Sequence, residues 1–136
     1  MKNKLIAFIP FVVWVIIIYI LLTLPAKDFG SIDVKIPFAD KVVHAGIFAL
    51  MVILFAWPYR YESFKKNRLK IFVVAVISVV YGIAMEFVQK NLTNPRGYEE
   101  WDMVADAVGA FIGFFMAMIL VNYFNDRQKR NSIKNA

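Results

Sequence analysis

The chain has 136 residues, enough for one domain, and 60% of them are hydrophobic, against about 45–50% in an ordinary soluble domain. The net charge of +6 could suggest a nucleic-acid-binding protein, but the basic residues stand in short segments between apolar runs, which is typical of membrane topology. We therefore expect the membrane lipid bilayer as a partner and no nucleic acid. The chain has no cysteine, which excludes disulfides and thiolate-bound metals.

Four long apolar runs follow one another along the chain, at residues 5–24, 42–57, 71–88 and 103–123. The first contains no charged residue, and at about 1.5 Å per residue it covers the ~30 Å hydrocarbon core. Each of the others contains a single ionisable residue, namely His44, Glu86 and Asp106 in chain order. The pattern predicts an all-α fold, an integral membrane four-helix bundle that forms one domain over residues 1–136.

The first run shares one feature with a secretory signal peptide, because Lys2 and Lys4 precede it. Signal h-regions span about 7–15 residues and end at a small-x-small cleavage site. This run is longer, and the Leu24-Pro25-Ala26 segment after it is a poor cleavage site. We interpret the run as an uncleaved membrane anchor.

The basic residues are distributed unevenly between the two sides of the predicted bundle. With the N-terminus inside, the inner side holds Lys2, Lys4, Arg60, Lys65, Lys66, Arg68, Lys70, Arg127, Lys129, Arg130 and Lys134. The outer side holds Lys27, Lys35, Lys41, Lys90 and Arg96. The positive-inside rule therefore predicts that both termini are cytoplasmic.

Polar residues gather at the outer ends of three predicted helices and in one outer loop. They are Asp40, Lys41 and His44, then Glu86 and Gln89, then Arg96 in the loop, and finally Asp102 and Asp106. Asp40 and His44 are four residues apart, as are Asp102 and Asp106, so each pair shares a helical face. We expect these residues to converge in one outward-facing pocket, whereas the inner helix ends show no matching cluster.

Small residues continue the polar faces of two helices. The face of Asp106 runs on through Gly109 and Gly113, a small-x-x-x-small pattern that lets two helices approach closely. Gly82 shares the face of Glu86. The carboxylates are therefore expected to point into the bundle rather than into lipid.

Several of these residues have a purely structural explanation. Asp40 could cap its helix, and Asp102 could be an acidic residue that the helix dipole stabilises in the first turn. Lys41 and Lys90 could snorkel to the interface. His44, Glu86 and Asp106 are harder to explain in this way, because an ionisable residue inside an apolar run is costly. The remaining structural alternative is a network in which the polar residues satisfy one another and brace the bundle.

The residue types allow two kinds of chemistry. One histidine with several carboxylates could bind a divalent metal, although the spacing is not specific for one metal. Crowded carboxylates cannot all ionise, so one could act as an acid while a histidine acts as a base. We assign candidate catalytic roles to His44, Glu86 and Asp102, and candidate substrate-binding roles to Asp40, Gln89, Arg96 and Asp106.

The set of motifs resembles the VanZ-like family of small bacterial membrane proteins over almost the whole chain. The matching elements are Pro25, Asp40-Lys41-x-x-His44, Glu86-x-x-Gln89, Arg96 and Asp102-x-x-x-Asp106-x-x-Gly109, with Gly113 beyond. Two positions depart from the family pattern, which often has Asn at Asp106 and Tyr at Phe48. Because Asn cannot ionise, the resemblance implies no acid–base role for Asp106. The resemblance implies a multi-pass protein of the bacterial plasma (inner) membrane, in a family whose founding member is associated with resistance to the glycopeptide teicoplanin.

These observations lead to one main functional hypothesis. The outward-facing pocket binds or processes an amphiphile, such as a lipid-linked cell-wall intermediate or a lipoglycopeptide, with catalytic turnover left open. One alternative is a non-catalytic structural or binding module. Another is a small proton-coupled transporter, which ranks lower because the ionisable residues lie near one helix end and the first run has none.

Overall fold

The computed structural model describes residues 2–23, 39–92 and 100–135, and these residues are almost entirely helical. The elements are α1 (Lys2–Ile6), α2 (Ile9–Thr23), α3 (Ala39–Ala56), the short 3-10 helix η2 (Trp57–Tyr59), α4 (Phe64–Leu92) and α5 (Glu100–Lys134). The described part of the chain contains no strand, which confirms the all-α fold class. Pro25 and Arg96 lie outside the described residues.

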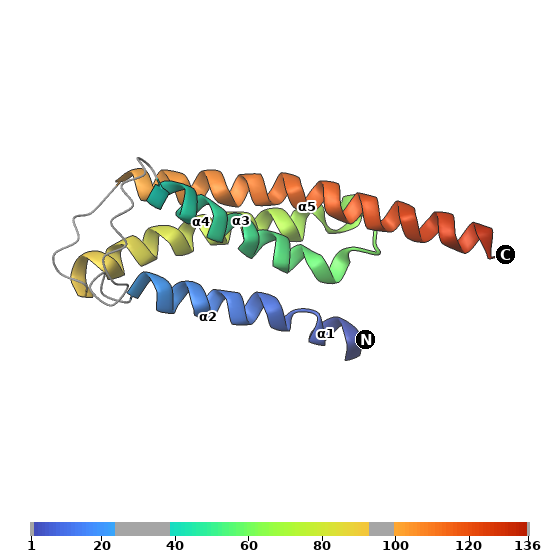
Figure 1. The fold of residues 1–136 in the computed structure, drawn as a ribbon, viewed down its shortest axis with the longest axis horizontal. Coiled ribbons are helices and arrows are strands. Elements are labelled where there is room, and N and C mark those ends of the chain that lie inside the picture. The colour runs from blue at the N-terminus through green and yellow to red at the C-terminus, as the bar shows by residue number, and fades with distance from the viewer. Residues whose placement is uncertain (1, 24–38, 93–99, 136) are drawn as a thin grey trace.

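The long helices lie side by side in a bundle, and α1 lies at the same end as the C-terminal end of α5 (Figure 1). Four helical segments are long and apolar enough to cross a membrane, namely Lys4–Thr23, Ala39–Tyr59, Phe64–Asn91 and Glu100–Lys134. They follow the order of the four apolar runs, and the last two helices extend well beyond the predicted boundaries. We call the end with α1 the basic end and the opposite end the polar-cluster end.

The first span is interrupted, where the sequence suggested one continuous helix over residues 5–24. Helix α1 ends at Ile6 and α2 begins at Ile9. Pro10 explains the break, because a proline ring clashes with the carbonyl four residues earlier and supplies no backbone N–H. The carbonyl in question belongs to Ile6, where α1 ends.

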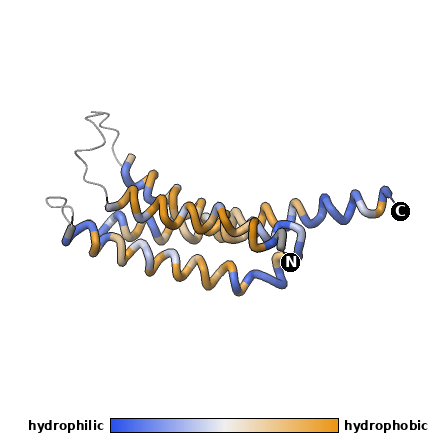
Figure 2. The backbone as a smooth tube through the Cα atoms, turned by 90° about the horizontal axis from the view of Figure 1, so that it is seen from below, coloured by the Kyte–Doolittle hydropathy of each residue, from blue (hydrophilic) through white to orange (hydrophobic). Residues whose placement is uncertain are grey.

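Helix α5 continues to Lys134, well beyond the predicted end of the fourth run at residue 123. The last three turns are rich in Arg, Lys and Gln, which are good helix formers. A helix of 35 residues is about 52 Å long and exceeds the ~30 Å hydrocarbon core. The hydrophilic C-terminal part of α5 accordingly projects past the other helices (Figure 2).

Helices α3 and α5 form the most extensive helix pair, along a seam of small residues. A Cβ atom at Gly113 would lie 2.5 Å from the carbonyl oxygen of Ala49, and one at Gly109 would overlap the backbone of Ala45. Glycine at both positions therefore lets the two backbones meet. The sequence prediction that this face of α5 is a packing face is confirmed.

Helix α2 is attached to the bundle by apolar packing and by two hydrogen bonds. Its buried residue Ile18 packs with Phe48 of α3 and Met85 of α4. Trp14 donates its indole N–H to the carbonyl of Ile47 over 2.9 Å. Tyr81 donates its hydroxyl to the carbonyl of Val15 over 3.2 Å, so α2 is tied to both α3 and α4.

The basic end holds a polar cluster of its own, so the expectation that it has none is wrong. Glu62 accepts hydrogen bonds from the Lys4 ammonium and from the buried Asn67 amide, the latter over 2.9 Å. The Lys4 ammonium also lies 4.4 Å from the centre of the Tyr59 ring. The hydrogen bond from Lys4, followed by that from Asn67, lowers the pKa of Glu62 below its usual value of 4.5. The cluster joins α1 to the start of α4.

Candidate functional site

His44 and Asp106 form a buried pair between α3 and α5. His44 Nδ1 lies 2.9 Å from Asp106 Oδ1, and the two residues are 8% and 1% exposed. The close contact of Gly109 with the Ala45 backbone brings the helices near enough for these short side chains to meet. When Asp106 is ionised its carboxylate can only accept, and His44 Nδ1–H is then the donor of this hydrogen bond.

The second carboxylate oxygen of Asp106 lies against α4 rather than against another polar group. A Cβ atom at Gly82 would be 2.6 Å from Asp106 Oδ2. The described residues offer this oxygen no hydrogen-bond partner. Gly82 is thus the position at which α4 makes room for the carboxylate.

Asp102 lies one turn before Asp106 and faces the other nitrogen of the imidazole. Its Oδ2 is 3.9 Å from His44 Nε2, and its Oδ1 is 2.9 Å from the Lys41 ammonium. Lys41 also contacts Asp40 Oδ2 at 2.6 Å. Lys41 was expected to stand with the outer polar residues, with snorkelling to the interface as its structural explanation, and its contacts place it in the cluster. Lys41 and His44 are three residues apart on one face of α3.

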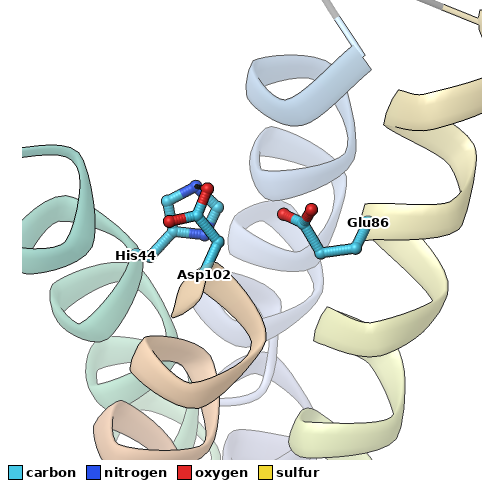
Figure 3. A group of neighbouring side chains, drawn as sticks. All are labelled: His44, Glu86 and Asp102. Carbon is cyan, nitrogen blue, oxygen red and sulfur yellow. Dashed lines mark ion pairs between the residues drawn. The ribbon is translucent and has the colours of Figure 1, made fainter. Parts of the chain in front are cut away.

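Glu86 reaches the same place from α4 and is only 3% exposed. Figure 3 shows its carboxylate directed toward His44 and Asp102, so that three helices contribute to one point. One nitrogen or oxygen from each of His44, Glu86 and Asp102 lies within 4.8 Å of the others. These three side chains are the described residues that could hold a metal ion.

The other predicted site residues lie in different surroundings. Gln89 is buried one turn beyond Glu86 on α4. Asp40 is in the first turn of α3 with about half its side chain exposed, so it forms an ion pair with Lys41 at the exposed edge of the cluster. Arg96 falls outside the described residues. The structure thus gathers His44, Glu86, Asp102 and Asp106, adds Lys41, and leaves their functional roles as predictions.

An apolar groove of about 720 Å³ runs along the outside of α4 and α5. It follows α5 from Glu100 to Phe115 and is closed on the α4 side by Val79 and Ile83. Glu100 is its only charged lining residue in the described part of the chain. The groove begins at the polar-cluster end of α5, and none of His44, Glu86, Asp102 and Asp106 lines it.

Comparison with known proteins shows no family for the chain. No family model matches the chain, and no solved structure matches it. A protein of Schizosaccharomyces pombe (strain 972 / ATCC 24843), "Uncharacterized protein C11E3.10", is 29% identical over 106 residues. The match covers 77% of this chain and 63% of the yeast protein, less than two thirds of that relative's length.

This relative corrects one expectation. It comes from a fungus, so the placement of the chain in a bacterial plasma membrane is contradicted. The four candidate spans are consistent with a membrane in general and with no particular one.

Proposed function

We propose that the chain is an integral membrane protein that binds an amphiphile, with the headgroup at the polar cluster and an acyl chain in the α4–α5 groove. One observation carries this proposal: helices long enough to span a membrane hold a buried cluster of ionisable residues and an apolar groove that begins at the same end of α5. The cluster would supply polar contacts for a headgroup, and the groove would supply an apolar surface for a chain.

The dimensions of the groove suit an acyl chain. From Glu100 to Phe115 the rise along α5 is about 22 Å at 1.5 Å per residue, within the ~30 Å hydrocarbon core. The groove lies on the outside of the bundle, where lipid would be the solvent. Its single charged residue stands at the polar-cluster end, where a headgroup would lie.

The buried position of His44, Glu86 and Asp106 favours a functional cluster. Ionisable side chains within a membrane span are costly and mark binding or transport sites by default. The resemblance to the VanZ-like family belongs to this proposal, because four of its motif residues, His44, Glu86, Asp102 and Asp106, lie together. A lipid-linked intermediate or a lipoglycopeptide would have the required headgroup and chain. If turnover occurs, His44 is the candidate base and Glu86 with Asp102 the candidate acid pair.

The experiment is native mass spectrometry of the protein purified in mild detergent, with identification of retained lipids. We expect a specific amphiphile on the wild type. Ala107→Trp fills the groove and should abolish retention, whereas Ala84→Trp, on an exposed face of α4 outside the groove, should not. Equal retention by both tryptophan variants would overturn the role of the groove. Equal retention by wild type and Glu86→Gln would overturn the role of the cluster.

A further inference from the structure

We propose that His44 Nε2, Glu86 and Asp102 bind one divalent transition-metal cation, and that Asp106 positions His44 for this role. The site is built from α3, α4 and α5 at the polar-cluster end (Figure 3). The proposal does not depend on an amphiphile ligand, because the ion itself is measured.

The first support is the orientation of the imidazole. Asp106 Oδ1 lies 2.9 Å from Nδ1, so an ionised Asp106 favours the tautomer with the proton on that nitrogen. A neutral imidazole in this tautomer presents the Nε2 lone pair on the side of Asp102, whose Oδ2 is 3.9 Å away. Metal-binding histidines usually donate the other ring N–H to a carboxylate or carbonyl in this way. A lone pair facing a carboxylate is repulsive unless a cation or a proton stands between them.

The second support is the spacing of the ligand atoms. The 3.9 Å between His44 Nε2 and Asp102 Oδ2 is too long for a hydrogen bond. Metal–ligand bonds of about 2.0–2.2 Å place two ligand atoms of one ion at about 3–4.4 Å from each other. The Glu86 oxygen completes a triangle whose sides are all within 4.8 Å. Three ligand atoms around one ion stand about 3–4 Å apart, so side-chain movements of about 1 Å would close the site.

The third support is the charge of the cluster. In the described residues, three buried or nearly buried carboxylates, Glu86, Asp102 and Asp106, gather around one imidazole and the Lys41 ammonium. Lys41 is also shared with Asp40. Buried carboxylates are stabilised by cations, and a dication bound between Glu86 and Asp102 would add to the stabilisation that Lys41 gives.

The donor set limits the identity of the metal. One imidazole nitrogen with two carboxylates is suited to Mn²⁺ or Zn²⁺, whereas Mg²⁺ and Ca²⁺ prefer oxygen ligands alone. Three protein ligands leave at least one coordination position open. That position could take water or an oxygen of a phosphate or carboxylate headgroup, which would connect the metal to the proposed amphiphile.

The test is metal binding by the full chain in detergent, after removal of metals with a chelator. Mn²⁺ is followed by electron paramagnetic resonance, and Zn²⁺ by calorimetry. We expect one ion per chain for the wild type. Glu86→Gln and Asp102→Asn should each weaken binding by at least tenfold. Asp106→Asn keeps an acceptor for Nδ1 and should weaken binding by about 10–100-fold, as for other groups that orient a metal ligand.

The matched control is Asp126→Asn, which removes an exposed carboxylate from the opposite end of α5 and should bind as the wild type does. Size-exclusion profiles show which variants are folded. Absence of saturable binding at one ion per chain in the wild type overturns the proposal, whatever the variants do. Unchanged affinity in folded Glu86→Gln and Asp102→Asn overturns it too. Lipid retention is measured separately, so each proposal can fail alone.

Discussion

Asp106 lies directly against Gly82, at a distance that leaves no room for a side chain on α4. A Cβ atom at Gly82 would be 2.6 Å from Asp106 Oδ2 and 2.9 Å from Asp106 Cβ. The same carboxylate holds His44 through its other oxygen. Contact between α4 and α5 and the orientation of the imidazole are thus coupled through one buried side chain.

The first prediction follows from this contact. Gly82→Ala should push Asp106 away from His44 and lower both thermal stability and metal affinity. Insertion of one methyl group into packed surroundings costs about 1–3 kcal/mol. The melting temperature in detergent and the Mn²⁺ titration measure the two effects.

Gly46→Ala is the matched control, because a Cβ atom at Gly46 would meet nothing within 4 Å. Alanine is the better helix former by about 0.5–1 kcal/mol. This variant should therefore melt at or above the wild-type temperature. If both variants lost similar amounts of thermal stability and Mn²⁺ affinity, the effect of Gly82→Ala would not come from the contact with Asp106.

The second prediction concerns the seam between α3 and α5. Gly113→Leu should separate the helices, because even a Cβ atom would be 2.5 Å from the Ala49 carbonyl oxygen. We expect aggregation or loss of the monodisperse peak in size-exclusion chromatography. Gly46→Leu places the same side chain on the exposed face of α3 and should remain monodisperse. A well-behaved Gly113→Leu protein would contradict the close seam.

The sequence was sufficient to predict the all-α fold class and the approach of His44, Glu86, Asp102 and Asp106 to one another. The fold class follows from the four apolar runs, which give the spans and their order. The approach of the polar residues follows from helical periodicity, because i,i+4 spacing places Asp102 and Asp106 on one face. The Lys4–Glu62 contact could not be predicted in this way. Its partners are 58 residues apart, and Glu62 lies in the short connection between η2 and α4, where no period sets the direction of a side chain.

The third prediction tests the position of Lys41 beside the proposed cation. Lys41 lies 2.9 Å from Asp102 Oδ1, where its charge would oppose a bound dication. In water, a unit charge about 6 Å from a dication contributes about 1.4 kcal/mol of repulsion. Lys41→Gln should therefore tighten Mn²⁺ binding about tenfold. Lys129→Gln, at an exposed position near the other end, should have no such effect. Weaker binding in Lys41→Gln would place the cation elsewhere.

The fourth prediction is a pH dependence at the basic end. Lys4 and Asn67 lower the pKa of Glu62 in the folded state, so its stabilising effect is fully present above the unfolded value of 4.5. It is lost as the pH falls through the lower, folded value. The pair is partly exposed, so the stabilisation is about 1 kcal/mol at most. The melting-temperature difference between wild type and Glu62→Gln should be present at pH 6.5 and vanish in strong acid. A constant difference across this range would contradict the assignment.

The last prediction separates a working site from a structural brace, and the geometry makes it residue-specific. His44 is the partner of a carboxylate that is 1% exposed, so His44→Ala leaves Asp106 as an uncompensated buried charge. Loss of one member of a buried pair costs about 3–5 kcal/mol. We expect a clear fall in melting temperature for His44→Ala. The His44→Leu/Asp106→Leu double variant should recover most of it, because both polar groups are then absent.

Glu86→Gln should behave in the opposite way. It keeps the shape of the side chain and removes a buried charge, which is often neutral or stabilising at a functional position. We expect normal accumulation and a metal-free melting temperature at or above that of the wild type, together with loss of Mn²⁺ binding and of lipid retention. If Glu86 only braces the bundle, Glu86→Gln will melt several degrees lower, and any loss of binding will follow the loss of folded protein. A Glu86→Gln protein that is stable but binds neither Mn²⁺ nor lipid would therefore assign Glu86 to a binding site that the rest of the bundle holds in place.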